Sequence, residues 1–222
     1  MLAASGEGSV SHARVVLVKW QEAMNSTPIL CFQVNEEIQL RLLEERHVEE
    51  YFALIERNRD FLQEWIDVEA YERSVETLRA YVKEHLLHFV EGSGYHLGIW
   101  YQDALVGLLD YRLNGRNRSV ELGYWLDAAM QGKGIVTQAC RTMVRHAFEV
   151  HLMHKVVISC AIDNPRSRAV AERLGFVQEG ILRQVGRLRD RYVDIVFYGL
   201  LVDEWHPQAE LPQESSSAPN QL

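Results

Sequence analysis

Cysteine is scarce in this chain of 222 residues, and long apolar segments are missing. The three cysteines, Cys31, Cys140 and Cys160, lie far apart and have no paired CxxC spacing, which excludes a disulfide framework or a zinc site built from cysteines alone. No apolar run reaches the roughly 18 residues that a membrane span requires, and the apolar patch at residues 15–18 is too short for a signal-peptide core. We therefore expect a cytoplasmic protein that does not cross a membrane.

Positive charge is also in deficit. Lys and Arg number 23 against 31 Asp and Glu, for a formal net charge of -8, which argues against the large basic surface that neutralises nucleic-acid phosphates. We expect no direct binding of nucleic acid. Hydrophobic residues make up 47% and charged residues 24%, ordinary values for a folded protein, and the length suits one domain rather than two.

The two ends of the sequence lack the patterns of folded elements. Residues 1–32 show no sustained apolar period and are expected to form a flexible extension. Residues 207–222 are rich in Pro, Gln and Ser, a composition that predicts a disordered tail. A single domain is therefore expected over residues 33–206.

Between these ends, apolar periodicity predicts a mixed α/β sheet with helices packed against it. Helical spacing follows Val48, a second helix begins near Ser74, whose side chain can cap it, and a third begins at Gly134. A short helix is expected from Ser167 to Leu174. Strand-like segments occur at residues 38–42, 95–101, 104–113, 119–126, 156–162, 177–188 and 192–202.

The stretch from residue 123 to 137 contains a strand, a short glycine loop and the start of a helix. Such a junction can bind a phosphate, because glycines let the backbone approach an anion and the first N–H groups of a helix lack partners; a plain tight turn is the alternative. A Walker loop would need Ser or Thr directly after the lysine, where Gly134 stands. A dinucleotide fingerprint would need glycine at Thr137. Both motifs are excluded.

The loop Gln131-Gly132-Lys133-Gly134 resembles the acyl-CoA pyrophosphate loop of the GNAT acyltransferases, with Val136 where that pattern has Gly or Ala. The segments at residues 121–126, 163–167, 173–176 and 179–180 are similar to the RimJ/RimL-type subgroup, and the likeness covers roughly residues 34 to 205. The resemblance implies an α/β (α+β) GNAT fold, with a mostly antiparallel sheet of about seven strands flanked by about four helices.

By this resemblance, acetyl-CoA is the co-substrate, and no metal is required. The backbone near Leu126 would bond the pantetheine arm as an added strand does. Asn164 would hydrogen-bond the same arm, or serve only as a turn residue at the entry of a helix. Lys133 would add charge, or lie solvated at the surface. The pyrophosphate would be held by backbone amides of the loop and of the helix start, among Gln131, Gly132, Lys133, Gly134, Ile135, Val136 and Thr137.

Acyl transfer to an amine needs an unprotonated amine and a stabilised leaving thiolate. Glu121 is the candidate base, directly or through a water molecule, although a strand-edge glutamate is often only a solvated charge. Many GNAT enzymes carry a tyrosine acid where this chain has Ala171. Ser167 is the candidate that hydrogen-bonds or protonates the sulfur, by resemblance to RimJ/RimL-type enzymes, and a helix-capping or first-turn role is the structural alternative.

The aromatic segment between the first two helices helps to wall the acceptor site in this family, so Trp65 and Tyr71 are candidate substrate contacts, with simple packing as the alternative. The resemblance implies an N-acetyltransferase that acts on a protein N-terminal α-amino group, as on a ribosomal protein, in a direct ternary complex. Alternatives are a small-molecule amine acceptor, such as a polyamine or an antibiotic, and a non-catalytic acyl-CoA-binding protein. The long terminal strands also permit a homodimer.

Overall fold

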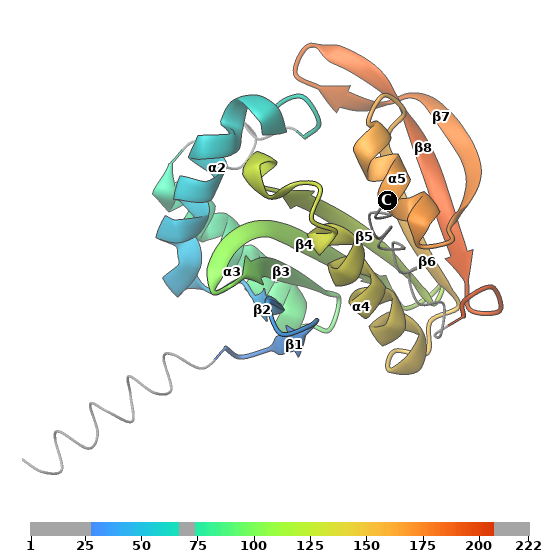
Figure 1. Ribbon diagram of the computed structural model, residues 1–222, viewed down its shortest axis with the longest axis horizontal. Helices are drawn as coiled ribbons and strands as arrows, with labels where there is room; N and C mark the ends of the chain where they lie inside the picture. Colours follow the sequence, from blue (N-terminus) through green and yellow to red (C-terminus); the bar gives the residue numbers. More distant parts are fainter. Residues whose placement is uncertain (1–27, 67–73, 207–222) are drawn as a thin grey trace, which may run out of the picture.

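The protein, seen in a computed structural model, is described here for residues 28–66 and 74–206 (Figure 1). One sheet of eight strands runs through it in the order β1-β2-β3-β4-β5-β6-β8-β7. The strands are β1 (Cys31–Gln33), β2 (Ile38–Leu42), β3 (Gly94–Tyr101), β4 (Ala104–Asn114), β5 (Ser119–Leu126), β6 (Lys155–Ala161), β7 (Val177–Leu188) and β8 (Arg191–Leu201).

The helices of the described residues connect these strands. The α-helices are α2 (Val48–Leu62), α3 (Val75–Val90), α4 (Ile135–Glu149) and α5 (Pro165–Arg173), with short 3-10 turns η1 (Glu45–His47) and η3 (Ala128–Met130). None of these helices combines the length and the apolar character needed to span a bilayer.

The sheet is antiparallel except at one place. All neighbouring strands pair antiparallel apart from β5 and β6, which are parallel and are connected through α4. A parallel pair requires such a crossover, because the chain must return to the same end of the sheet. The parallel pair lies between the two antiparallel parts of the sheet.

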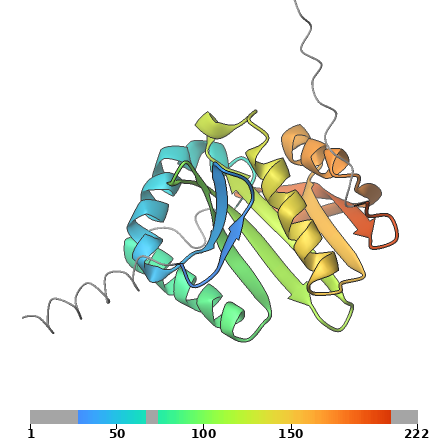
Figure 2. The ribbon, with the colours of Figure 1, turned by 60° about the horizontal axis from the view of Figure 1, so that its bottom comes forward.

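Helices cover both faces of the sheet (Figure 2). The α4 and α5 helices pack on one face around buried residues such as Leu122 and Ile158. The α2 and α3 helices pack on the other face, around Tyr51, Trp100 and Leu108. Side chains alternate between the faces along each strand, so consecutive residues of β5 face opposite helical layers, and so do consecutive residues of β6.

The predicted mixed sheet with helices on it is confirmed, and Ser74 caps α3 as expected, accepting a hydrogen bond from the Thr77 amide. The sheet has eight strands rather than about seven, because the short β1 adds an edge that a three-residue segment does not reveal by periodicity. The expected domain boundary at residue 33 falls inside β1. The short helix α5 begins at Pro165, two residues before the expected start, because proline is well suited to the first helical position.

Candidate active site

The site is built around an opening between β5 and β6. The two strands pair over four positions only, ending at Leu122 and Ile158. Beyond them β5 stays paired with β4 as far as Leu126, and β6 stays paired with β8 as far as Ala161. The strands therefore diverge, and over this stretch their facing backbone groups have no strand partner among the described residues. An extended ligand can add to such an edge by main-chain hydrogen bonds.

The loop after β5 leads into an uncapped helix. Gly132 and Gly134 have φ values of 78° and 71°, in the left-handed region that glycine adopts without strain. Gly134 is the N-cap of α4, and no side chain caps this helix. The first N–H groups of α4 lack acceptors within the helix, and the helix dipole favours negative charge there, so the loop forms an anion site.

The α2 helix holds the start of this loop. The Asn58 side-chain oxygen accepts a hydrogen bond from the Ala128 amide at 3.0 Å. The Arg57 Nε lies 2.9 Å from the Asp127 Oδ2, while the other oxygen of Asp127 accepts from the Ala129 amide. The position of the anion site is thus fixed by contacts with an element distant in sequence.

The predicted loop residues divide by where their side chains lie. Ile135 and Thr137 are buried, and Val136 packs against the same core, so these three offer a ligand their backbone only. The Lys133 side chain is exposed, and its Nζ lies 5.2 Å from the centre of the Tyr101 ring. Gln131 is half-buried just before the first glycine.

On the α5 side of the opening, Asn164 and Ser167 lie in one turn. Asn164 is the N-cap of α5, and its side-chain oxygen accepts from the Ser167 amide at 3.0 Å. The Ser167 Oγ donates to the Tyr124 Oη at 3.2 Å, and the Tyr124 hydroxyl donates to the Ser167 carbonyl at 3.1 Å. Burial raises the pKa of the Tyr124 phenol well above its ordinary value, so this hydroxyl is neutral. The structural alternatives for both predicted residues are therefore observed, and they leave the Asn164 amide group and the Ser167 hydroxyl beside the opening.

On the opposite face of the sheet, Glu121 lies at the narrow end of the opening. Its Oε1 accepts from the Ser159 Oγ at 2.9 Å, and the Arg112 Nη2 lies 3.2 Å from the same oxygen. The Glu121 side chain is 40% exposed, so a ligand can reach it. Gly123 follows it on the same face, where its missing side chain leaves the Arg112 guanidinium as the nearest group.

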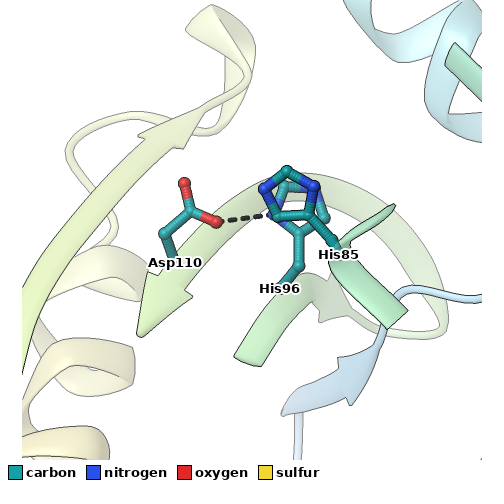
Figure 3. A group of neighbouring side chains, drawn as sticks. All are labelled: His85, His96 and Asp110. Atoms are coloured by element: carbon teal, nitrogen blue, oxygen red, sulfur yellow. Dashed lines mark hydrogen bonds and ion pairs between the residues drawn. The ribbon is translucent and has the colours of Figure 1, made fainter. Parts of the chain in front are cut away.

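A buried polar group continues this face (Figure 3). Asp110 pairs with Gly123 across the strands, and its Oδ1 lies 2.6 Å from the Nδ1 of His96, which is 1% exposed. Burial alone would raise the pKa of Asp110, but the His96 imidazole lowers it below the ordinary value. The neighbouring His85 donates from its Nδ1 to the Tyr81 carbonyl at 2.9 Å.

His85, His96 and Asp110 each offer a metal-ligand atom, and these atoms lie within 4.8 Å of one another. The hydrogen bond between Asp110 and His96 occupies one carboxylate oxygen and one ring nitrogen of this group. A metal ion bound through that oxygen and that nitrogen would have to break the bond. The group is a hydrogen-bonded pair with a second imidazole beside it.

Trp65 follows α2 and packs against Ala161, Leu188 and Val193. It therefore connects the end of α2 with the end of β6 and with the β7–β8 hairpin. The other residue expected at the acceptor wall, Tyr71, lies outside the described residues. Sequence reasoning missed Arg112, Tyr124 and Ser159, because their proximity depends on strand register, which one sequence does not reveal.

The family model for the acetyltransferase (GNAT) domain matches residues 37–177. The chain belongs to the GNAT acetyltransferase family. The predicted family, fold and acetyltransferase class are thereby confirmed. The ribosomal-protein-serine acetyltransferase of Escherichia coli (strain K12) is 33% identical to this GNAT protein over 172 residues, which cover 77% of this chain and 96% of the relative.

Two solved structures have the same fold as this GNAT chain. A RimL ribosomal L7/L12 α-N-protein acetyltransferase in complex with coenzyme A is 30% identical with a TM-score of 0.76, covering 79% of this chain and 99% of that one. The microcin C7 self-immunity acetyltransferase MccE, in complex with acetyl-CoA and AMP, is 27% identical with a TM-score of 0.73, covering 76% and 94%.

Proposed function

We propose that this protein transfers an acetyl group from acetyl-CoA to the N-terminal α-amino group of a protein, with a ribosomal protein as the favoured acceptor class. The observation that carries the proposal is the single opening between β5 and β6, which has the uncapped α4 N-terminus at its wide end and Glu121 at its narrow end. The names of the relatives support the acceptor: one acetylates a ribosomal-protein serine and another the α-amino group of L7/L12.

The described residues fit acetyl-CoA. The uncapped helix start, with Gly132 and Gly134 in left-handed conformation, suits the pyrophosphate. The free strand edge at Leu126 and the Asn164 amide group suit the pantetheine arm, which carries amide groups of its own. Lys133 lies at the surface of the same loop and adds positive charge. When bound, acetyl-CoA supplies the activated acetyl group.

In this proposal Glu121 accepts the proton of the incoming amine. An α-amine with a pKa near 7.8 is only about 14% unprotonated at pH 7, and a lysine near 10.4 about 0.04%, so a base accelerates either reaction. The Ser159 hydroxyl and the Arg112 guanidinium orient the carboxylate toward the opening. Ser167, on the other face, hydrogen-bonds the leaving sulfur. Trp65 forms part of the wall beside the acceptor.

The test is a direct assay of acetyl transfer. The purified protein is incubated with acetyl-CoA and three acceptors: a peptide with a free N-terminal serine, the same peptide with a blocked N-terminus and an internal lysine, and spermidine. Mass spectrometry should detect acetylation of the free N-terminus and none of the blocked peptide. Acetylation of spermidine alone would indicate a small-molecule enzyme. Binding of acetyl-CoA with no transfer to any acceptor would indicate an acyl-CoA-binding protein.

A further inference from the structure

Tyr124 joins the two elements on either side of the opening, on the face opposite Glu121. The residue belongs to β5, whereas both of its hydrogen-bond partners belong to Ser167 in the first turn of α5. Its hydroxyl donates to the Ser167 carbonyl at 3.1 Å and accepts from the Ser167 Oγ at 3.2 Å. One phenol thus fixes both the backbone and the hydroxyl of the serine.

We propose that Tyr124 is a positioning residue for Ser167 in the acetyl transfer described above, so the inference rests on that function. A serine hydroxyl alone rotates freely, so nothing directs its hydrogen at the sulfur. Tyr124 limits that rotation, because its Oη and the Ser167 Oγ lie within hydrogen-bond distance.

Each of the two hydroxyls can donate and accept, so their hydrogen bond can run in either direction. In the structure the single Tyr124 hydrogen is donated to the Ser167 carbonyl, and the Ser167 hydrogen points at Tyr124. When the Tyr124 hydrogen turns from that carbonyl to the Ser167 Oγ, the Ser167 hydrogen is free to point at the sulfur, and the chain of two donors strengthens that bond. In the transfer, the N–C bond forms and the C–S bond breaks, with the electron pair passing to sulfur. The acceptor enters as an ammonium and gives one proton to Glu121 to become the neutral amine. The proton that its nitrogen loses on forming the amide goes to the sulfur, so both hydroxyls keep their protons.

The rest of the surroundings favours a neutral Tyr124 donor. Burial raises the pKa of the phenol. It also raises the pKa of the Cys160 thiol, an effect that a hydrogen bond from Ser167 offsets only in part, so both groups are neutral. The guanidinium of Arg168, on the same helix, is held by Tyr198 at 3.0 Å and does not bond Tyr124.

Tyr198 provides the matched control. Its hydroxyl also bonds α5 from a strand, accepting from the Arg168 Nε and donating to the Glu172 Oε1, both at 3.0 Å, but it does not reach Ser167. We expect Tyr124→Phe to lower kcat about three- to tenfold, the value of one ordinary hydrogen bond, with the acetyl-CoA-induced rise in unfolding temperature unchanged. Tyr198→Phe should leave kcat within about twofold.

A double-mutant cycle separates positioning from general fixation of the helix. Tyr124→Phe should have no further effect on kcat once Ser167→Ala has removed the hydroxyl, and should still slow Ser167→Thr, which keeps it. An equal loss with and without that hydroxyl would overturn the inference, and so would an equal loss in Tyr198→Phe.

A second measurement does not depend on a variant that folds. In a crystal structure with acetyl-CoA, the Tyr124 Oη should lie within about 3.2 Å of the Ser167 Oγ, and a gap too wide for a hydrogen bond would contradict the inference. A wild-type protein that acetylates no amine would contradict the proposed function itself. An active enzyme that is slowed by Ser167→Ala and not by Tyr124→Phe would contradict this inference alone.

Discussion

Glu121 and Ser159 hydrogen-bond across the point where β5 and β6 separate, with the Ser159 Oγ 2.9 Å from the Glu121 Oε1. The bond lies beside Leu122 and Ile158, the last paired residues of the two strands. Two donors, Ser159 and Arg112, hold the same carboxylate oxygen, so the direction of the carboxylate is fixed before any amine arrives. This placement connects the divergence of two strands with the chemistry proposed for the site.

Glu121→Gln should lower kcat/KM for a peptide amine by about a hundredfold or more at pH 7, because the amide keeps the shape but accepts no proton. The loss should shrink as the pH rises toward the pKa of the amine, where the free base becomes abundant without help. Steady-state rates from pH 6 to 9 measure both effects.

Glu179→Gln is the control for this variant. The Glu179 side chain is 41% exposed, close to the 40% of Glu121. It pairs with Lys155, the first residue of β6, at the end of that strand away from the opening. The Glu179→Gln variant should retain wild-type rates at every pH. A pH-independent loss in Glu121→Gln would exclude general-base action and leave Glu121 with a binding role only.

Gly134→Asp should abolish the stabilisation by acetyl-CoA, because it brings a negative charge to the anion site at the start of α4. At about 100 times its dissociation constant, the ligand should stabilise the wild type by roughly 2.7 kcal/mol, or about 5 to 10 °C in unfolding temperature. Thermal unfolding with and without acetyl-CoA measures this shift.

Gly175→Asp controls for backbone strain. Gly175 has a φ of 83°, similar to the 71° of Gly134, and lies after the end of α5. Without ligand, both variants should unfold at a lower temperature than the wild type, because a positive φ is less favourable for aspartate than for glycine. Only Gly175→Asp should keep the shift with acetyl-CoA. If Gly134→Asp keeps a full shift, the pyrophosphate binds elsewhere.

Gly123→Leu should raise the KM for the acceptor by roughly tenfold, equivalent to about 1.4 kcal/mol, without weakening acetyl-CoA binding. A Cβ at Gly123 would meet the Arg112 Nη1 at 3.5 Å and the Asp110 Cβ at 3.6 Å, which are ordinary contacts, so the fold accepts a side chain there. The longer chain would extend over the floor beside Glu121, where the amine must lie. Gly123→Ala should show a smaller effect, and an unchanged KM in Gly123→Leu would place the acceptor elsewhere.

Local patterns in the sequence predict most of the elements of this fold. The strand over residues 119–126 has the predicted bounds, and the Ser74 cap and the helix that begins after Gly134 also agree with expectation. These features depend on period, capping and glycine conformation, all of which act within a few residues. The short β1 was missed because three residues carry too little periodicity.

The site itself is predictable only in part. The glycine loop and Asn164 could be located because their roles follow from local chain geometry. The contacts of Glu121 with Ser159 and Arg112 could not, because they depend on the register of three strands, and a shift of one residue would turn each side chain to the other face. The same reason hid the contact between Tyr124 and Ser167.

His146 should make the protein less stable in mild acid. Burial, with a smaller contribution from His151, lowers the pKa of His146 to about 4, and its Nε2 is buried without a hydrogen-bond partner among the described residues. The unfolded chain binds a proton near pH 6.5 and the folded chain only near pH 4, so stability rises with pH across this window. After allowance for solvent screening, His146 contributes about 1–2 kcal/mol to the change in unfolding free energy across this window.

His146→Leu removes this titration and keeps an apolar contact beside Phe32, whose ring centre lies 4.8 Å from that of His146. Urea unfolding at pH 5.0 and 7.5 should show a smaller difference in unfolding free energy for His146→Leu than for the wild type. His88→Leu, at an exposed position on α3, should keep the wild-type difference. Every other histidine is shared by the wild type and His146→Leu, so the comparison isolates His146. Equal pH dependence in His146→Leu and the wild type would mean that His146 is protonated in the folded protein as easily as in the unfolded chain.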